Sequence, residues 1–147
     1  SASYTRLVDM GVETFLVASS LAGVLAQRLV RTVCDECAET KPLSEGACRE
    51  LGVDPLVHVG KPVRTGKGCI ACQHTGYRGR TGIYELMMVD DSVRELVLAN
   101  ADASRIKKAA REGGMETLRE DGLRKILNGE TSVAEVCRVT TEEAVLD

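Results

Sequence analysis

Two pairs of cysteines, each with two residues between its members, constrain the fold of this chain more than any other feature. The first pair is Cys34 and Cys37, and the second is Cys69 and Cys72. Two C-x-x-C pairs separated by about thirty residues are typical of a closed four-cysteine site for structural zinc. The spacing therefore predicts that segments distant in the sequence meet at one Zn²⁺ ion. Because four thiolates complete a tetrahedron, such a site leaves no open position for catalysis.

The composition is that of a globular chain with an aliphatic core. Its 147 residues suffice for one ordinary domain or two small ones, and 44% of them are hydrophobic, with no Trp and one Phe. No apolar run approaches the roughly 20 residues that span a bilayer, and the first residues lack a signal-peptide pattern. We therefore expect a cytosolic chain, in which paired cysteines indicate metal binding rather than disulfides. Cys48 and Cys137 fall outside the pairs, and we expect a spare thiol and a small, buried or half-buried helix residue, respectively.

The patterns of apolar residues predict helices at both ends of the chain and strands around the cysteine pairs. β-Branched residues favour a strand from about Val24 to Val33, and residues 83–89 form a second expected strand. Pro42 should open a turn, and residues 55–68 should form a loop or a short strand. The expected helices cover residues 3–10, 13–21, 44–51, 92–99, 102–112 and 117–128, with a last helix that begins at Ser132.

Capping residues sharpen some of these boundaries. Ser44 and Asp102 should each cap the start of a helix. Two pairs have the capping-box spacing, Ser92 with Glu95 and Ser132 with Glu135.

Charge is distributed unevenly along a chain whose net charge is −3. Residues 55–84 carry no acidic residue and five basic ones, namely Lys61, Arg64, Lys67, Arg78 and Arg80. One interpretation is a contact with another protein or subunit, in which Arg78 and Arg80 hold carboxylates. A second is that the block balances the charge of the metal site and is otherwise solvated. Nucleic-acid binding is disfavoured, because the chain is acidic overall, with a pI near 5.5.

The sequence contains no complete catalytic or nucleotide-binding motif. The segment from Gly60 to Gly68 resembles a phosphate loop, but it has five residues between its glycines instead of four. Gly68 also replaces the hydroxyl residue that would hold Mg²⁺, so we expect a turn near the zinc site. His74 could in principle be a metal ligand, but four thiolates already complete a tetrahedron.

Several segments, in order along the chain, resemble the secretion ATPases of the type II secretion and type IV pilus superfamily. The matching segments are Arg6–Glu13 (RLVDMGVE), Leu16–Leu21, Leu25–Arg31, the paired cysteines, Thr75–Glu85 (TGYRGRTGIYE), Gly114–Arg119, Asp121–Leu123 and Gly129–Ser132. The form of the segment from Thr75 to Glu85 favours the type II secretion branch over the pilus motors.

The resemblance implies a role in a larger motor. Family members resemble RecA-like homo-hexameric ATPases on the cytoplasmic face of the bacterial inner membrane, where they drive pseudopilus assembly. Their partner would be the cytoplasmic domain of an inner-membrane secretion protein, and no nucleic acid is expected. The family's phosphate loop and acidic boxes lie upstream of the region matched here, so that ATP and Mg²⁺ are implied only for the full-length protein. The family pattern also supports the four cysteines as zinc ligands and makes Arg80 a candidate for contact with a neighbouring subunit.

The expected fold class is α/β, as an α+β fragment. Residues 1–33 would be the last part of a RecA-like core, residues 34–80 a tetracysteine zinc subdomain, and residues 81–147 a strand followed by a helical subdomain. We expect this chain alone to be inactive. The alternatives are a free-standing zinc-ribbon adaptor that binds nucleic acid or protein, and part of a type IV pilus assembly ATPase.

Overall fold

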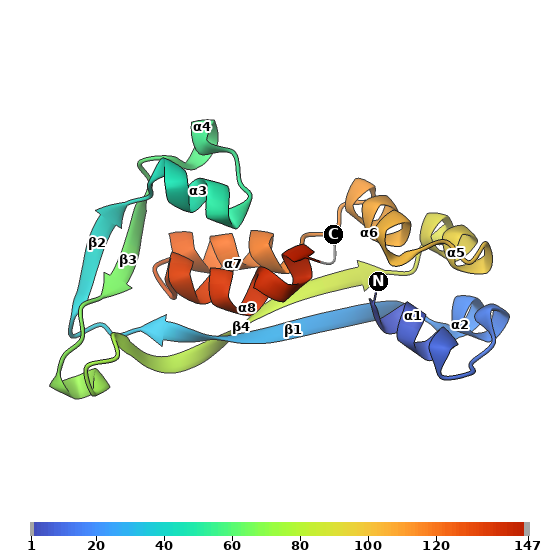
Figure 1. Cartoon of the computed structure of the whole chain (residues 1–147), viewed down its shortest axis with the longest axis horizontal. Helices are drawn as coiled ribbons and strands as arrows, with labels where there is room; N and C mark the ends of the chain where they lie inside the picture. Colours follow the sequence, from blue (N-terminus) through green and yellow to red (C-terminus); the bar gives the residue numbers. More distant parts are fainter. Residues whose placement is uncertain (1, 146–147) are drawn as a thin grey trace. The chain divides into compact units, whose positions relative to one another are not determined.

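A computed structural model describes residues 2–145, and it describes side chains from residue 6 to residue 141. The chain is a mixed α/β protein with two antiparallel pairs of strands (Figure 1). In order, its elements are α1 (Ala2–Asp9), α2 (Thr14–Ser20), β1 (Gly23–Val33), β2 (Ala38–Pro42), α3 (Glu45–Leu51), α4 (Pro55–His58), β3 (Pro62–Gly66), a short 3-10 helix η1 (Ile70–Cys72), β4 (Tyr77–Met88), α5 (Asp91–Leu98), α6 (Ala103–Glu112), α7 (Leu118–Leu127) and α8 (Val133–Val145). The expected fold class is confirmed.

Strands β1 and β4 pair with each other over most of their length. The Val89 N–H donates to the carbonyl of Ala22, and the Cys34 N–H donates to the carbonyl of Gly76. Partner numbers fall along one strand as they rise along the other, so the pair is antiparallel. Strands β2 and β3 form the second antiparallel pair, in which Ala38 lies opposite Gly66 and Pro42 opposite Pro62.

The chain divides into two compact units, and each is described by itself. The first comprises residues 1–26 and 85–117. Its aliphatic core confirms the expectation from composition and consists of Val17, Ala18, Met87, Val89, Val93, Val97, Ala101, Ile106 and Ala110. Helix α6 begins after Asp102, whose carboxylate accepts from the Arg105 N–H. This cap was predicted from the sequence.

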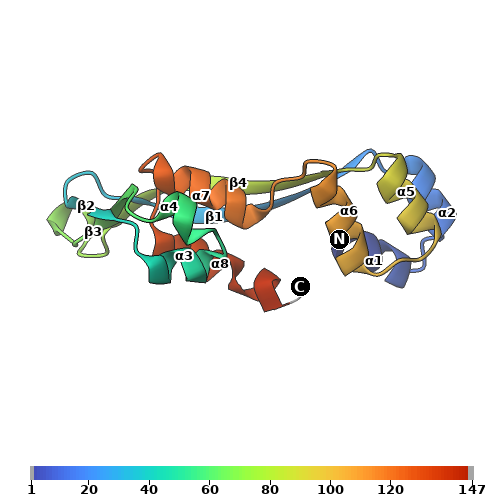
Figure 2. The same ribbon diagram turned by 90° about the horizontal axis from the view of Figure 1, so that it is seen from above.

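The second unit comprises residues 27–84 and 118–147 and contains all four paired cysteines. Figure 2 shows helices α7 and α8 along the ribbon of strands β1 and β4. The two helices pack closely at Gly122, where an added Cβ would lie 2.5 Å from Cγ1 of the buried Val136. Helix α3 packs against α8, and it starts at Ser44 and ends at Gly52, which adopts φ 71°, both as expected.

Three local expectations differ from the structure. The cap of helix α5 lies two residues earlier than predicted, because the Asp90 carboxylate, rather than the Ser92 hydroxyl, accepts from the Val93 N–H. Strand β4 begins at Tyr77, six residues before the predicted start, since pairing with β1 extends it. Helix α4 lies in a segment that was expected to be loop or short strand, because the Asp54 carboxylate caps it by accepting from the Leu56 N–H; strand β3 in the same segment agrees with the expectation.

Candidate metal centre

The four paired cysteines come together at the point where the two strand pairs meet. Cys34 and Cys37 lie in the connection from β1 to β2, and Cys69 and Cys72 lie around η1, between β3 and β4. The ligand atoms of all four lie within 4.8 Å of one another. Cys34 and Cys72 are buried and the other two are partly buried, so the cluster is closed on most sides.

The sulfur spacing matches a tetrahedral zinc site. The Sγ atoms of Cys34 and Cys69 are 3.8 Å apart, those of Cys37 and Cys72 are 3.8 Å apart, and those of Cys69 and Cys72 are 3.7 Å apart. Zinc–thiolate bonds of about 2.3 Å in a regular tetrahedron place the sulfurs about 3.8 Å apart. A disulfide requires sulfurs about 2.05 Å apart, and all six cysteines are free. The geometry therefore fits a bound metal ion and does not fit a pair of disulfides.

Backbone N–H groups point at the sulfurs and favour thiolates. The Cys69 and Gly76 N–H groups donate to Sγ of Cys72 at 3.2 Å, and the Gly68 N–H donates to Sγ of Cys37 at 3.3 Å. Burial raises the pKa of Cys72, but these N–H donors and the neighbouring thiols outweigh burial and lower the pKa to about 6. Burial raises the pKa of Cys37 to about 11, despite the Gly68 donor. One anion is thus accommodated readily, whereas four thiolates need the charge of a cation.

Glycines allow the backbone segments around the cluster to approach closely. A Cβ at Gly66 would overlap the carbonyl group of Gly76, which is the group that accepts from the Cys34 N–H. Gly76 itself has φ 81°, a conformation that side chains disfavour. Gln73 and His74 are also left-handed, with φ 54° and 62°, in the turn that leaves Cys72. This contact and these turns hold the start of β4 against the end of β3.

The other candidate ligand and the unpaired cysteines lie elsewhere. Among residues 6–141, the group that could hold a metal consists of the four cysteines and does not include His74. Cys48 is fully buried on α3, and Cys137 is partly buried on α8, which agrees with the expectation for Cys137. Burial raises the pKa of Cys137, which disfavours its thiolate form.

Three of the five residues in the basic block have partners inside the chain. Arg64 pairs with Asp35 at 2.9 Å, Lys67 pairs with Glu39 at 3.3 Å, and Lys61 Nζ lies 3.3 Å from Nδ1 of His58.

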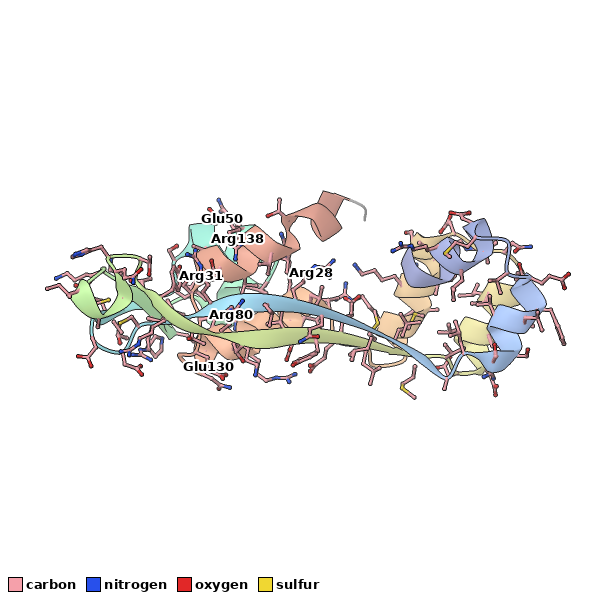
Figure 3. The ribbon with its side chains drawn as sticks, turned by 90° about the horizontal axis from the view of Figure 1, so that it is seen from below. Arg28, Arg31, Glu50, Arg80, Glu130 and Arg138 are labelled. Carbon is pink, nitrogen blue, oxygen red and sulfur yellow. The ribbon has the colours of Figure 1, made fainter. Side chains whose placement is uncertain are left out.

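The remaining two, Arg78 and Arg80, lie exposed on β4. Their side chains have no hydrogen-bonding or ionic partner in the part of the chain whose side chains are described. Figure 3 shows Arg80 on the strand ribbon, and Arg78 lines an open, mainly polar cavity of about 400 Å³. The structure therefore leaves these two guanidinium groups available, and their contact role stays a prediction.

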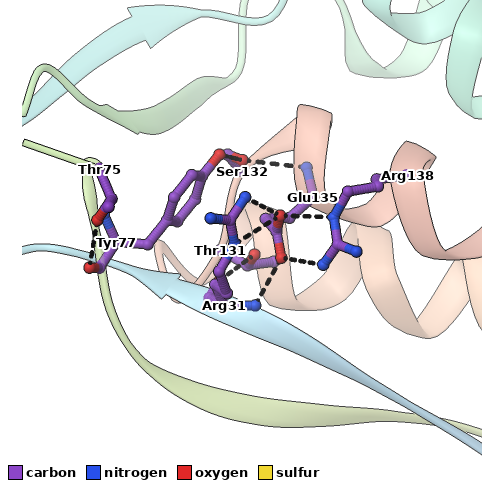
Figure 4. Close-up of polar contacts among 7 residues, drawn as sticks. All are labelled: Arg31, Thr75, Tyr77, Thr131, Ser132, Glu135 and Arg138. Carbon is purple, nitrogen blue, oxygen red and sulfur yellow. Dashed lines mark hydrogen bonds and ion pairs between the residues drawn. The ribbon is translucent and has the colours of Figure 1, made fainter.

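A buried carboxylate in the first turn of α8 meets two arginines, a contact that the sequence analysis did not predict (Figure 4). The side chain of Glu135, on α8, is 1% exposed and accepts from Nε and Nη2 of both Arg31 and Arg138, and from the Arg31 N–H. Burial raises the pKa of Glu135, but the hydrogen bonds from Arg138 and Arg31 outweigh burial and lower the pKa to about 2. The Arg31 guanidinium also lies over the Tyr77 ring, 4.3 Å from its centroid. Glu135 had been predicted only as half of a capping box.

Four sulfurs at tetrahedral spacing, held by N–H donors at the junction of two strand pairs, define a protein with a preformed tetracysteine metal-binding geometry. The chain belongs to the family of type II/IV secretion system proteins, whose model matches residues 1–138. It is 49% identical over 139 residues to "Type II secretion system protein E" from Pseudomonas aeruginosa, a match that covers 95% of this chain and 27% of that protein.

Two other relatives represent both branches of the family. The chain is 48% identical over 139 residues to "Type IV pilus assembly ATPase PilB" from Thermus thermophilus, covering 94% of this chain and 16% of that protein. It is 45% identical over 141 residues to "Type II secretion system ATPase E" from Vibrio cholerae, a match that covers 94% of this chain and 27% of that protein. The chain thus spans about a quarter of the length of its type II relatives. The predicted resemblance is confirmed.

None of the helices in residues 2–145 is long and apolar enough to cross a membrane.

Proposed function

We propose that this chain is the zinc-binding part of a type II secretion ATPase, and that its metal centre braces the motor rather than taking part in hydrolysis. The observation that carries the proposal is the set of sulfur distances of 3.7 and 3.8 Å, which a tetrahedral Zn²⁺ ion would satisfy without rearrangement. Cys34, Cys37, Cys69 and Cys72 would be its ligands. A closed tetrathiolate has no open coordination position, so the role of the ion would be structural.

The larger assembly is inferred from the family. Residues 1–33 would complete a RecA-like ATPase core, residues 34–80 would form the zinc subdomain, and residues 81–147 would add a strand and a helical subdomain. The full-length motor would be a homo-hexamer on the cytoplasmic face of the inner membrane, bound to the cytoplasmic domain of an inner-membrane secretion protein. ATP and Mg²⁺ would bind outside this chain. The high identity to relatives named as ATPases supports this assignment.

Arg78 and Arg80 would contact a neighbouring subunit or the membrane partner. Both side chains are exposed, and the chain supplies them with no carboxylate partner among its described side chains. Arginine forms bidentate pairs with carboxylates, so an acidic surface is the partner chemistry we expect. Nucleic-acid binding receives no support, because Arg64 and Lys67 are already paired with acidic residues of the same chain.

Metal analysis and activity measurements test the proposal together. The purified chain should contain about one zinc per molecule and should not turn over ATP. The full-length protein with all four cysteines changed to serine should lose stability, and with it hydrolysis and secretion. A metal-free quadruple variant with the stability of the wild type would refute the structural role. ATP turnover by the chain alone at the rate of the full-length protein would refute the assignment of catalysis to other regions.

A further inference from the structure

We propose that Glu135, which is not a metal ligand, sets the affinity of the four-cysteine site for zinc. It would do so as a positioning residue, by locking the α7–α8 loop (residues 128–132) onto the strands that carry the cysteines. The inference rests on the proposed zinc site. It concerns a buried charged cluster that neither the metal coordination nor the proposed ATPase role requires.

The α7–α8 loop is attached to the first cysteine pair at two points. The Val33 N–H, adjacent to Cys34, donates to the carbonyl of Glu130 at 3.0 Å. Arg64 donates through Nη1 to the carbonyl of Gly129 at 3.0 Å and through Nη2 to the Asp35 carboxylate at 2.9 Å. Because Asp35 lies inside the first C-x-x-C pair, Arg64 ties the loop directly to that pair.

The loop is also attached to the segment that follows the second pair. The Tyr77 hydroxyl lies 2.6 Å from the Ser132 hydroxyl. Tyr77 directly follows Gly76, whose N–H donates to Sγ of Cys72 and whose carbonyl accepts from the Cys34 N–H. A displacement of Tyr77 would therefore be felt at two of the four cysteines.

Glu135 holds these attachments together. Its carboxylate fixes the Arg31 N–H and guanidinium at 2.7 to 3.0 Å, and the same guanidinium covers the Tyr77 ring. The Thr131 hydroxyl donates to the carbonyl of Arg31 at 2.7 Å, which closes the contact between loop and strand. Charge-assisted hydrogen bonds to a buried carboxylate are among the stronger polar interactions in proteins. The Glu135 carboxylate on α8 thus fixes the end of β1 directly, through Arg31. It fixes the start of β4 indirectly, because Arg31 packs on Tyr77.

Linkage then connects Glu135 to the metal. Without an ion, no metal–sulfur bonds join the two cysteine pairs, so the pairs separate more easily and the attachments beside them loosen. If zinc binding favours the closed loop, the closed loop must favour zinc binding by the same factor. Residues that orient metal ligands typically change metal affinity by about 10- to 100-fold. Since Glu135 acts through two further residues, we expect the lower end, about tenfold.

The test is a competition titration of Zn²⁺ with a chromophoric chelator under reducing conditions, on the wild-type chain, Glu135→Gln and Tyr77→Phe. Glu45→Gln is the matched control, because it also removes an Arg–Glu ion pair on a helix of the same unit, but at a site that is 61% exposed. We expect zinc affinity about tenfold lower for Glu135→Gln, a smaller loss for Tyr77→Phe, and a change of less than about twofold for the control. The rise in melting temperature caused by zinc should shrink in the same order.

The outcomes separate this inference from the proposed function. A wild-type chain that does not bind zinc would overturn both. Wild-type binding with unchanged affinities in Glu135→Gln and Tyr77→Phe would overturn the inference alone, even if both variants unfold at lower temperature. If Glu135→Gln does not fold, Tyr77→Phe decides, since it removes one hydroxyl and keeps the ring.

Discussion

Replacing Gly122 with alanine should destabilise the chain, although alanine is the better helix former. Gly122 lies in the interior of α7, where the exchange would add up to about 1 kcal/mol from helix propensity. An added Cβ, however, would lie 2.5 and 3.0 Å from the two γ-carbons of Val136, which is fully buried. Overpacking costs about 1 to 3 kcal/mol. Because the nearer contact is only 2.5 Å, we expect a cost of about 2 to 3 kcal/mol and therefore a net loss of about 1 to 2 kcal/mol.

The same exchange at Gly46 should have the opposite sign and serves as the control. Gly46 lies near the start of α3, and the nearest atom to an added Cβ there is the Ser44 hydroxyl at 4.0 Å. Without a clash, Gly46→Ala should stabilise the chain by a few tenths to about 1 kcal/mol. Urea unfolding at fixed excess zinc, followed by circular dichroism, gives both free energies.

A double-mutant cycle identifies the cause. Val136→Ala removes the two γ-carbons that clash, so Gly122→Ala should cost less in that background than in the wild type. The coupling free energy should be about 1 kcal/mol, in the range found for residues in contact. Additive losses, or a Gly122→Ala variant as stable as the wild type, would refute the close packing of α7 on α8.

The remaining predictions concern Glu135, the glycine contact and the free arginines. The pKa of Glu135 is lowered in the folded state to about 2, so its stabilisation is present above its ordinary pKa of about 4.5 and is lost as the pH falls from there toward 2. The unfolding free energies of wild type and Glu135→Gln should differ by about 3 kcal/mol at pH 7 and converge near pH 2. A gap independent of pH would contradict this. Gly66→Ala should weaken zinc binding and lower the melting temperature in calorimetry, because its Cβ would displace Gly76, and unchanged values would show that the two segments do not touch. Changing Arg78 and Arg80 together to alanine should leave the melting temperature within about 2 °C of the wild type. In the full-length protein, the double change should lower hexamer formation or partner-stimulated hydrolysis. Full assembly and activity would exclude the contact role.

The meeting of the two cysteine pairs could be predicted because ligand spacing is a local property of the sequence. A C-x-x-C pair presents two sulfurs from one turn, and two such pairs have one compact solution around a tetrahedral ion. The helix caps at Ser44 and Asp102 were predictable for the same reason, since each caps a donor only three residues away.

The role of Glu135 could not be predicted, because its partner Arg31 lies 104 residues away. The Ser132 hydroxyl does cap α8 by accepting from the Glu135 N–H, as the capping-box spacing indicated. The carboxylate that should have completed the box is instead used by two arginines. The sequence does not show whether this carboxylate bonds to the backbone of its own helix or to distant arginines. Only the tertiary structure distinguishes these two cases.

Strand β2, and with it the pairing of β2 with β3, escaped prediction for a different reason. Residues 38–42 are mostly polar and end in Pro42, which reads as a turn. The partner strand begins with Pro62 directly opposite. Both prolines lie at the same end of the pair, where the loss of an N–H donor is tolerated, so the strands form despite weak intrinsic preference.

The coordination of zinc in the purified chain tests the central claim most directly. X-ray absorption at the zinc edge should show one ion per chain bound by four sulfur atoms at about 2.3 Å, with no nitrogen or oxygen ligand. The sulfur distances of 3.7 and 3.8 Å already have the spacing that this coordination requires. A chain isolated without metal that fails to take up zinc, or a spectrum with fewer than four sulfur ligands, would contradict the account.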